Sequence, residues 1–245
     1  MQLNLKITYK PFGDAAILIA WDAEISISIS NDILEFQQKI KALKDDNIVD
    51  VIMGYSSLTV VFKKRKMEYL NAVKSLKKTY FSECNALKKM PFIWEIPVCY
   101  DLEFGIDLQE MAKKVNLEVS EIIKLHSQER YRVYFIGFLP GFLYLGGLQK
   151  QLFNERKANP RLHVPKGAVA IGGEQTGVYP TESAGGWNII GKTPINFFNI
   201  NKDNPCFAKA GDFIKFVAID KHQFLQIEKE VQDTSYKIFK TLYNA

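Results

Sequence analysis

The sequence predicts an α+β protein in which a small α+β domain precedes a β-barrel. Short alternating segments and amphipathic helical segments succeed one another up to residue 88, which is typical of a compact α+β unit. From Tyr131 onward, short strand-like segments separated by glycine and proline turns dominate, which indicates a barrel-like sheet. The length of 245 residues allows two domains, and we place them at 1–88 and 89–245.

The first domain is expected to have the order ββαββα. Alternating apolar residues predict four strands, at 2–8, 15–21, 49–53 and 58–62. Asn31 or Asp32 is expected to cap a first helix, and residues 67–80 show the apolar spacing of a second. Residues 85–91 are expected to form the linker to the second domain.

The second domain is expected to begin with a strand at 92–98, followed by two short helices. Asp107 and Ser120 precede these helices and are predicted to cap them, and the second helix is predicted to end near His126. After the glycine-rich part of the chain, a strand is expected at 213–217. A last helix follows it, with apolar residues between 224 and 231.

Composition excludes several classes of protein. The net charge of +5 is spread over scattered lysine pairs, and no nucleic-acid reader motif accompanies it. No apolar run approaches the roughly 18 residues that a membrane helix needs, and the N-terminus lacks the apolar core of a signal peptide. We therefore expect a cytoplasmic protein that binds neither nucleic acid nor membrane. The three cysteines lie far apart and predict no disulfide or zinc site.

The stretch from Tyr131 to Pro194 holds most of the glycines, interleaved with aromatic residues. Glycine allows positive φ and close approach of another group. Glycine turns, aromatic walls and a few polar groups are what a small-molecule pocket needs. The alternative is a barrel whose corners require glycine, and both interpretations are compatible.

Within this stretch, Gly186 to Thr193 matches the phosphate-loop pattern G-x-x-x-x-G-K-T. A phosphate loop follows a buried strand and opens a helix. Here glycines precede the pattern, and Pro194 with a β-like segment follows it. The context therefore favours a strand that carries Trp187 between turns.

Two further features have a binding interpretation and a structural one. Pro140-Gly141 predicts a type II turn flanked by Phe138 and Phe142, which would form a pocket wall, a subunit contact or a satellite core cluster. Arg161 follows a proline and would present a rigid fork to a carboxylate or phosphate. The alternative for Arg161 is a structural salt bridge at the barrel rim.

Four polar residues are further candidates for substrate binding or catalysis. Gln175, Thr176 and Tyr179 lie on a glycine-rich turn and could orient an amide-like substrate, or serve the turn alone. His126 is the first candidate for acid–base chemistry, although a histidine at a helix C-terminus can simply interact with the helix dipole. No histidine pair has metal-ligand spacing, so we expect no metal site in this chain.

Three ordered blocks, YRVYFIGFLPGFLYLGGL, PRLHVPKGAVAIGGEQTGVYP and GGWNIIGKTP, closely resemble the family of the 5-oxoprolinase B subunit. That family also contains the kinase inhibitor KipI and was formerly labelled allophanate hydrolase subunit 1. The blocks are also similar to part of the carboxyltransferase region of urea carboxylase. The resemblance implies an N-terminal α+β domain and a cyclophilin-like barrel. It further implies 5-oxoprolinase subunits C and A as partners, and ATP-dependent opening of 5-oxoproline to glutamate.

This resemblance gives each candidate residue an expected role. The chain would bind and orient the lactam in the complex, where ATP and magnesium act, and would hold no covalent cofactor. Arg161 or Lys192 would face an anionic group, and aromatic residues would wall the site. The expected substrate-binding residues are Phe138, Pro140, Phe142, Arg161, Gln175, Thr176, Tyr179, Gly186, Trp187, Lys192 and Thr193.

The resemblance also leaves two alternatives. One is a KipI-like inhibitor of a sensor histidine kinase, which would need only an exposed apolar surface such as the turn at 138–145. The other is a subunit related to urea carboxylase or allophanate hydrolase. That function would require biotin carried elsewhere, because the chain has no biotin-accepting MKM motif.

Overall fold

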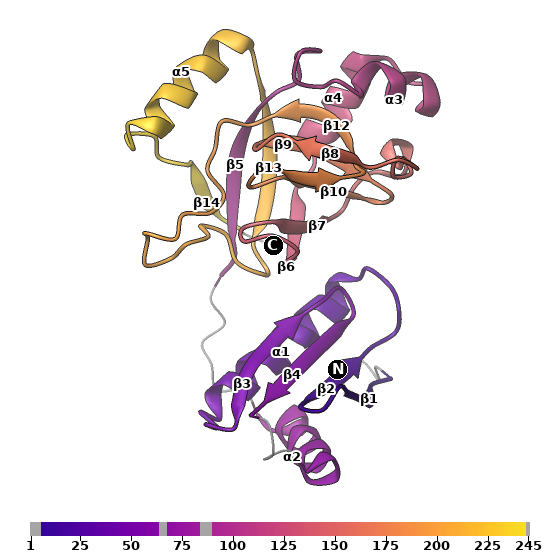
Figure 1. Ribbon diagram of the computed structural model, residues 1–245, viewed down its shortest axis with the longest axis vertical. Helices are drawn as coiled ribbons and strands as arrows, with labels where there is room; N and C mark the ends of the chain where they lie inside the picture. The colour runs from indigo at the N-terminus through magenta and orange to yellow at the C-terminus, as the bar shows by residue number, and fades with distance from the viewer. Residues whose placement is uncertain (1–5, 64–67, 84–89, 244–245) are drawn as a thin grey trace. The chain divides into compact units, whose positions relative to one another are not determined.

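The computed structural model describes residues 6–63, 68–83 and 90–243 (Figure 1). The chain divides into two compact units, Met1–Lys89 and Met90–Ala245. Each unit has a hydrophobic core of its own. Most of the linker expected at 85–91 lies outside the described residues, as does most of the expected strand at 2–8.

The first unit is a four-stranded antiparallel sheet with two helices. The strand order is β1-β2-β4-β3. Its elements are β1 (Thr8–Phe12), β2 (Ala16–Ala20), α1 (Ile27–Ala42), β3 (Ile48–Met53), β4 (Ser57–Phe62) and α2 (Tyr69–Phe81). Ile17 and Ile19 of β2 are fully buried, as the period-2 pattern predicts, and they join apolar side chains of both helices in one core.

Helix α1 begins earlier than the sequence predicted. Ser26 is its N-cap, so Asn31 and Asp32 lie inside the helix. The Asp32 carboxylate accepts hydrogen bonds from Trp21 Nε1 at 2.7 Å and from the Tyr80 hydroxyl at 2.8 Å. The side chain that suggested a cap therefore ties the helix to β2 and α2, a use of aspartate that local pattern does not distinguish from capping.

The second unit is a closed barrel of seven strands in the order β12-β9-β10-β7-β6-β13-β5, completed by pairing of β12 with β5 at Lys192 and Cys99. All neighbours are antiparallel except β5 and β13. The strands are β5 (Phe92–Cys99), β6 (Tyr131–Ile136), β7 (Leu143–Gly146), β9 (Ala168–Gly172), β10 (Gln175–Val178), β12 (Asn188–Lys192) and β13 (Phe213–Ile219). The predicted α+β class with a barrel is confirmed.

Helices pack against the strands of the barrel. They are α3 (Leu108–Val115), α4 (Val119–Gln128), the 3-10 helix η1 (Lys150–Leu152) and α5 (Lys221–Gln232), and the short strand β14 (Lys240–Leu242) follows. Helix α4 is capped by Glu118, whose capping box with Glu121 replaces the predicted cap Ser120. Strand β14 pairs with the start of β5, so the segment after α5 returns to the barrel.

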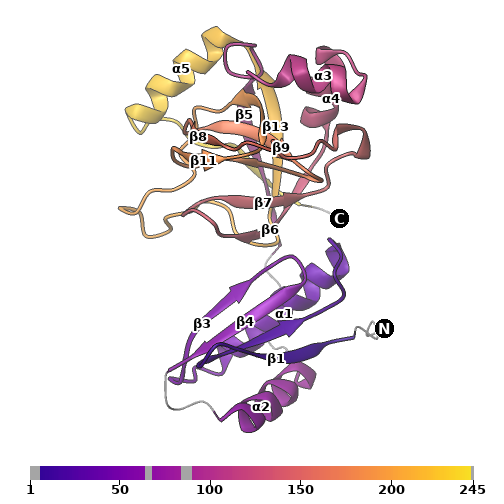
Figure 2. The same cartoon turned by 45° about the vertical axis from the view of Figure 1, so that its right-hand side comes forward.

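A two-stranded sheet covers part of the outer surface of the barrel. Strands β8 (Arg161–Val164) and β11 (Ser183–Gly185) pair with each other and lie side by side in Figure 2. Val164 of β8 joins a satellite core with residues from β9, β12 and the loops beside them. The hairpin thus adds a second apolar layer outside the barrel wall.

Candidate functional site

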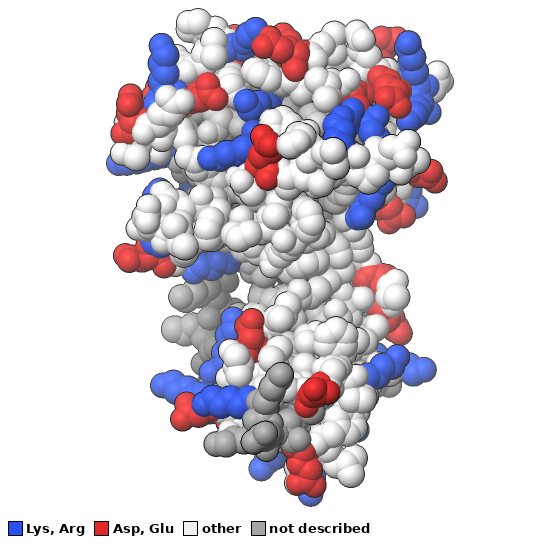
Figure 3. All heavy atoms as spheres, viewed as in Figure 1, with Lys and Arg blue, Asp and Glu red and all other residues white. Residues whose placement is uncertain are grey.

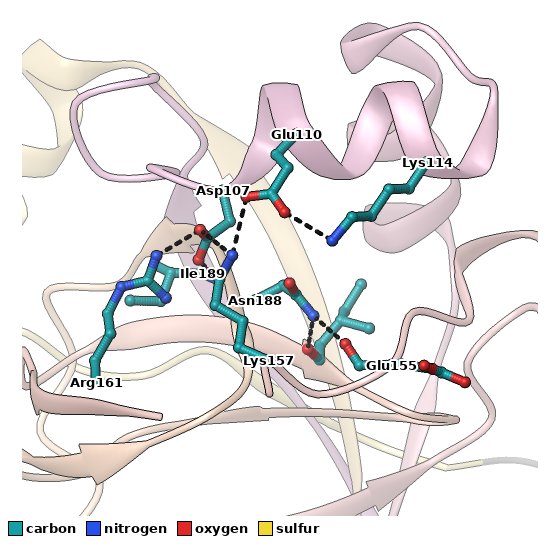
Figure 4. A network of polar contacts seen from close by, with 9 residues as sticks. Asp107, Glu110, Lys114, Glu155, Lys157, Arg161, Asn188 and Ile189 are labelled. Carbon is teal, nitrogen blue, oxygen red and sulfur yellow. Dashed lines mark hydrogen bonds and ion pairs between the residues drawn. The ribbon is translucent and has the colours of Figure 1, made fainter. Parts of the chain in front are cut away.

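A network of charged side chains gathers where α3 meets β12 (Figure 4). Asp107 Oδ1 contacts Arg161 Nη2 at 2.6 Å and Lys157 Nζ at 3.0 Å. Lys157 also contacts Glu110 at 3.0 Å, and Glu110 pairs with Lys114 at 2.7 Å. We call these five residues the Asp107 network.

Asp107 joins the network because its carboxylate turns toward β12 instead of its own helix. It is the N-cap of α3, as predicted, but its side chain makes no capping hydrogen bond. Oδ2 accepts from the Ile189 amide at 2.7 Å, and the Asp107 amide donates to the Ile189 carbonyl at 3.0 Å. Gly105 permits this approach, because a Cβ there would lie 2.5 Å from the Ile190 carbonyl oxygen.

The segment that carries Lys157 and Arg161 is held by the start of β12. The Lys157 amide donates to the Gly186 carbonyl at 2.7 Å. The Asn188 side chain donates to the carbonyls of Glu155, at 2.9 Å, and Ile171, at 3.2 Å. Gly186 therefore takes part through its backbone, and the segment that carries Lys157 is held at Glu155 and at Lys157.

The charges in this network shift one another's pKa values. Hydrogen bonds from Lys114 and then Lys157 lower the pKa of Glu110 to about 2. Burial alone would lower the pKa of Lys157, but hydrogen bonds and charge from Asp107 and Glu110 outweigh it and raise the pKa. Both groups therefore stay charged at neutral pH.

Arg161 retains one hydrogen-bonding position. Its side chain is 29% exposed and that of Lys157 is 17% exposed. The Arg161 Nη1 atom is buried and has no hydrogen-bond partner among the described residues. Such an unsatisfied buried donor is uncommon in native structures.

The predicted aromatic walls are packed against one another. Phe142 lies 5.8 Å from the Tyr179 ring and 5.6 Å from the Trp187 ring, and all three side chains are buried. They belong to the satellite core under the β8–β11 hairpin. We call these three residues the aromatic cluster. Their placement corrects the expectation of an open pocket and matches the alternative of a core cluster, because mutual packing removes more apolar surface from water.

The turn between β6 and β7 has the predicted type II geometry at Pro140-Gly141. The Phe142 amide donates to the Leu139 carbonyl at 3.0 Å, and Gly141 has φ of +84°. Phe138 precedes it with φ of +63° and is 64% exposed. An aromatic residue with positive φ is strained, so the hairpin tip displays Phe138 at a cost in energy.

His126 is placed in the barrel core, away from any surface. The Thr176 hydroxyl donates to the Ala170 carbonyl at 3.2 Å, so it accepts from His126 Nε2 at 2.8 Å. Nδ1 then accepts from the Tyr100 hydroxyl at 2.7 Å. Burial lowers the pKa of His126 to about 3. Both nitrogens are occupied and the ring is neutral, so the geometry supports a structural role and gives the predicted acid–base role no support.

The remaining predicted residues are dispersed. Lys192 ends β12 with its Nζ 5.5 Å from the rings of Phe104 and Phe224. Ile189 and Lys192 lie three residues apart on β12, or about 10 Å, so Lys192 is separate from the Asp107 network. Thr193 is buried, and Gln175 has a buried Oε1 with no partner in the described part of the chain. Asn188–Lys192 of the Gly186–Thr193 pattern forms strand β12 instead of a phosphate loop, as its context predicted, but Trp187 lies just before the strand.

Residues 7–208 match the family described as carboxyltransferase domain, subdomain C and D. The chain belongs to this family. It is 34% identical to the 5-oxoprolinase B subunit of Bacillus subtilis (strain 168), over 93% of this chain and 99% of that protein. It is 36% identical to the 5-oxoprolinase B subunit of Escherichia coli O157:H7, over 84% and 93%. The predicted kinship with the 5-oxoprolinase B subunit is confirmed.

Within this carboxyltransferase family the likeness extends to the fold of larger proteins. The structure aligns with K. lactis urea amidolyase at a TM-score of 0.83 and 18% identity, over 99% of this chain. The chain spans 16% of that protein's length. At this identity the comparison shows the shared fold alone.

For this member of the family, sequence reasoning missed Asp107 and Lys157 as site residues. Asp107 was interpreted only as a helix cap, and its partners Arg161 and Ile189 lie 54 and 82 residues away. Lys157 lies four residues before the predicted Arg161, in the run ERKANPR. The sequence offers one signal for Lys157: Arg156 and Lys157 are two cations close to Arg161, which follows a proline.

The described ranges contain neither a membrane-spanning helix nor a cluster of metal ligands. No helix in the described ranges has both the length and the apolar character of a membrane span. No group of three or more histidine, cysteine, aspartate or glutamate side chains in those ranges is arranged to hold a metal ion. On the face shown in Figure 3, acidic and basic side chains are interspersed.

Proposed function

We propose that the chain is the B component of an ATP-dependent 5-oxoprolinase complex, which hydrolyses 5-oxoproline to glutamate. One observation carries this proposal. Three curated relatives, each named as the B subunit of 5-oxoprolinase, are 34%, 36% and 37% identical to the chain over 93–99% of their own lengths. Identity over nearly the whole of each relative supports a shared role better than a local motif does.

The chemistry of the substrate defines what such a subunit contributes. 5-Oxoproline carries a carboxylate and a lactam, and water attacks amides poorly. Transfer of a phosphoryl group from ATP to the lactam oxygen would activate the carbonyl. This chain would hold and orient the substrate, with the partly exposed Arg161 side chain as the donor for its anionic group and Lys157 as a second nearby charge.

The described part of the chain has neither a phosphate loop nor a cluster of metal ligands. Asn188–Lys192 of the Gly186–Thr193 pattern is a strand, so the pattern presents no helix N-terminus to phosphates. No group of three or more histidine, cysteine, aspartate or glutamate side chains in the described ranges is arranged to hold a metal ion. We therefore assign ATP and magnesium to the partner subunits, C and A, in this proposal.

The test is reconstitution with candidate subunits C and A, followed by measurement of glutamate released from 5-oxoproline with and without ATP. We expect release to require this chain, both partners and ATP. Arg161→Ala should raise the KM for 5-oxoproline roughly tenfold, since one charged hydrogen bond is lost, and Arg161→Lys should recover part of it. Unchanged kinetics in Arg161→Ala would make the residue purely structural, and lactam turnover by this chain alone would contradict the subunit assignment.

A second function is favoured by one observation, the exposed and strained Phe138. An apolar side chain displayed at such cost suits a docking surface, as a KipI-like inhibitor of a sensor histidine kinase would need. The purified chain would then inhibit kinase autophosphorylation without partners, and Phe138→Ser would abolish the inhibition. Inhibition by the wild type and the variant alike would exclude this surface.

A further inference from the structure

A cavity of about 400 Å3 in the barrel unit shares no lining residue with the Asp107 network or the aromatic cluster. Three segments line it: strand β5 at Trp94, the loop 195–207 after β12, and the stretch 231–240 from the end of α5 to β14. Figure 1 shows where these segments run in the barrel unit. Its volume falls in the range of small-molecule sites. We call it the C-terminal cavity.

One wall of this cavity is aromatic and held in place. The Trp94 indole donates through Nε1 to the buried Asp212 carboxylate at 2.9 Å, which fixes its ring. The Phe207 ring packs edge-on at 5.1 Å from the Trp94 ring. Lys240 Nζ lies 4.9 Å from the same indole. A ligand would therefore meet a preorganised apolar surface with little ordering cost.

The charged residues that line the cavity are all lysines. Lys202, Lys237 and Lys240 line it, and none of its described lining residues is acidic. Lys202 and Lys237 form no ion pair with any described residue. Acidic residues lie outside the lining: Asp203 follows Lys202 in the chain, and the charges of Glu230 and Glu95 reach Tyr236. Three lysines without a carboxylate in the lining itself attract an anion.

Backbone contacts hold both long segments of the cavity lining. The Asn199 amide donates to the Pro205 carbonyl at 2.9 Å, and the Lys202 amide donates to the Asn199 carbonyl at 3.2 Å. In the other segment the Ser235 amide donates to the Glu230 carbonyl at 2.9 Å, and Thr234 has φ of +61°. A β-branched residue with positive φ is an outlier, and such strain concentrates at ligand sites.

We propose that the C-terminal cavity binds a small organic anion that contains a ring. The carboxylate would lie between Lys202 and Lys237, and the ring would pack on Trp94 and Phe207. Three neutral asparagines in the lining, Asn196, Asn199 and Asn204, add hydrogen-bonding groups without opposing charge. This site is separate from the proposed function, since binding here requires neither ATP nor another subunit.

The test is calorimetric titration of the full chain with benzoate, and with benzamide as its neutral counterpart, at low salt. We expect benzoate to bind saturably and benzamide at least roughly tenfold more weakly. The double variant Lys202→Gln/Lys237→Gln should weaken benzoate binding by a similar factor, because both lysines are exposed and their loss should leave the fold intact. Lys113→Gln, an exposed lysine of α3, is the matched control and should bind as the wild type does.

A second variant adds charge without removing a contact. Asn199 Oδ1 accepts from the Asn201 amide at 3.0 Å, and Asn199→Asp retains that acceptor while it places an anion in the lining. Benzoate affinity should fall here too. The proposal is overturned if benzoate fails to bind at about 10 mM, or if it binds these variants and the wild type equally. Displacement of benzoate by 5-oxoproline would name that lactam acid as the ligand, and lack of displacement would point to another ring carboxylate.

Discussion

The Asp107 network and the C-terminal cavity both place lysine or arginine beside aromatic side chains. They differ in whether a carboxylate neutralises those positive charges. In the network, Lys157 and Arg161 share the carboxylate of Asp107, and the aromatic cluster next to β12 is packed closed. In the cavity, Lys202 and Lys237 have no acidic partner among described residues, and the rings of Trp94 and Phe207 border a hollow. Basic and aromatic composition is therefore a poor guide to a binding site unless counterions and packing are known.

The difference also separates two uses of a positive charge. A cation that neutralises a buried carboxylate stabilises the fold, and its removal leaves that carboxylate unpaired. A cation on an open rim contributes little to stability and remains available to a ligand. The closed region should therefore be sensitive to mutation in stability measurements, and the cavity in binding measurements.

The largest expected effect is that of Asp107→Ala. The change leaves the Ile189 amide without its side-chain acceptor and Lys157 and Arg161 without their shared counterion, so the free energy of unfolding should fall by about 3 kcal/mol. Urea unfolding followed by fluorescence in a Trp21→Phe background measures this, because the other two tryptophans, Trp94 and Trp187, belong to the second unit.

Two controls bracket that prediction. Asp220→Ala removes the exposed N-cap of α5, which accepts from the Gln223 amide at 2.7 Å, and should cost about 1 kcal/mol. The double variant Lys202→Gln/Lys237→Gln in the cavity should change stability by less than about 0.5 kcal/mol. If Asp107→Ala proved no more harmful than these variants, the contrast between the two regions would collapse.

The aspartates of α1 and α3 show where sequence reasoning stops. Asp32 and Asp107 both matched a capping pattern, and each instead uses its carboxylate for partners in other elements. The alternation around Ile17 and Ile19 and the Pro140-Gly141 turn were predictable, because period and turn type are local properties. The partner of a carboxylate depends on tertiary packing and leaves no local pattern.

The two aromatic regions show a second limit. Rings between glycine turns suit a pocket wall and a packed cluster equally, and only side-chain direction decides between them. The C-terminal cavity was not predicted because it depends on β14, an exposed strand of three residues, pairing with the start of β5. So short a strand shows no periodicity by which it could be recognised.

A second prediction tests whether the barrel interior beside β10 excludes water from His126. Burial lowers the pKa of His126 from 6.5 to about 3 in the folded state, so protonation favours unfolding. The stabilisation is complete above pH 6.5 and is lost progressively as the pH falls toward 3, by about 2 kcal/mol between pH 7 and pH 5. Unfolding of the wild type and of His126→Gln at several pH values isolates this effect.

The advantage of the wild type over His126→Gln should shrink as the pH falls through this range. His222→Gln is the matched control, because His222 is exposed, and its difference from the wild type should stay nearly constant. A constant difference for His126→Gln as well would mean that water reaches the His126 ring. The barrel interior beside β10 would then be open to solvent.

The smallest effect concerns Thr234 on the cavity rim. The amides of Thr234 and Ser235 donate to the carbonyls of Val231 and Glu230, a helix ending in which glycine is the usual residue at the position of Thr234. Thr234→Gly should relieve backbone strain of about 1–2 kcal/mol. The freer unfolded chain of the glycine variant should cost about 0.4–1 kcal/mol. Denaturant unfolding should therefore show a net gain in stability of about 0.5 kcal/mol. Lys229→Gly, at an exposed position within α5, should instead cost about 1 kcal/mol. If Thr234→Gly destabilised the protein by about 1 kcal/mol as well, the positive φ of Thr234 would not be strained. The cavity rim would then lose the backbone strain that supports a ligand site there.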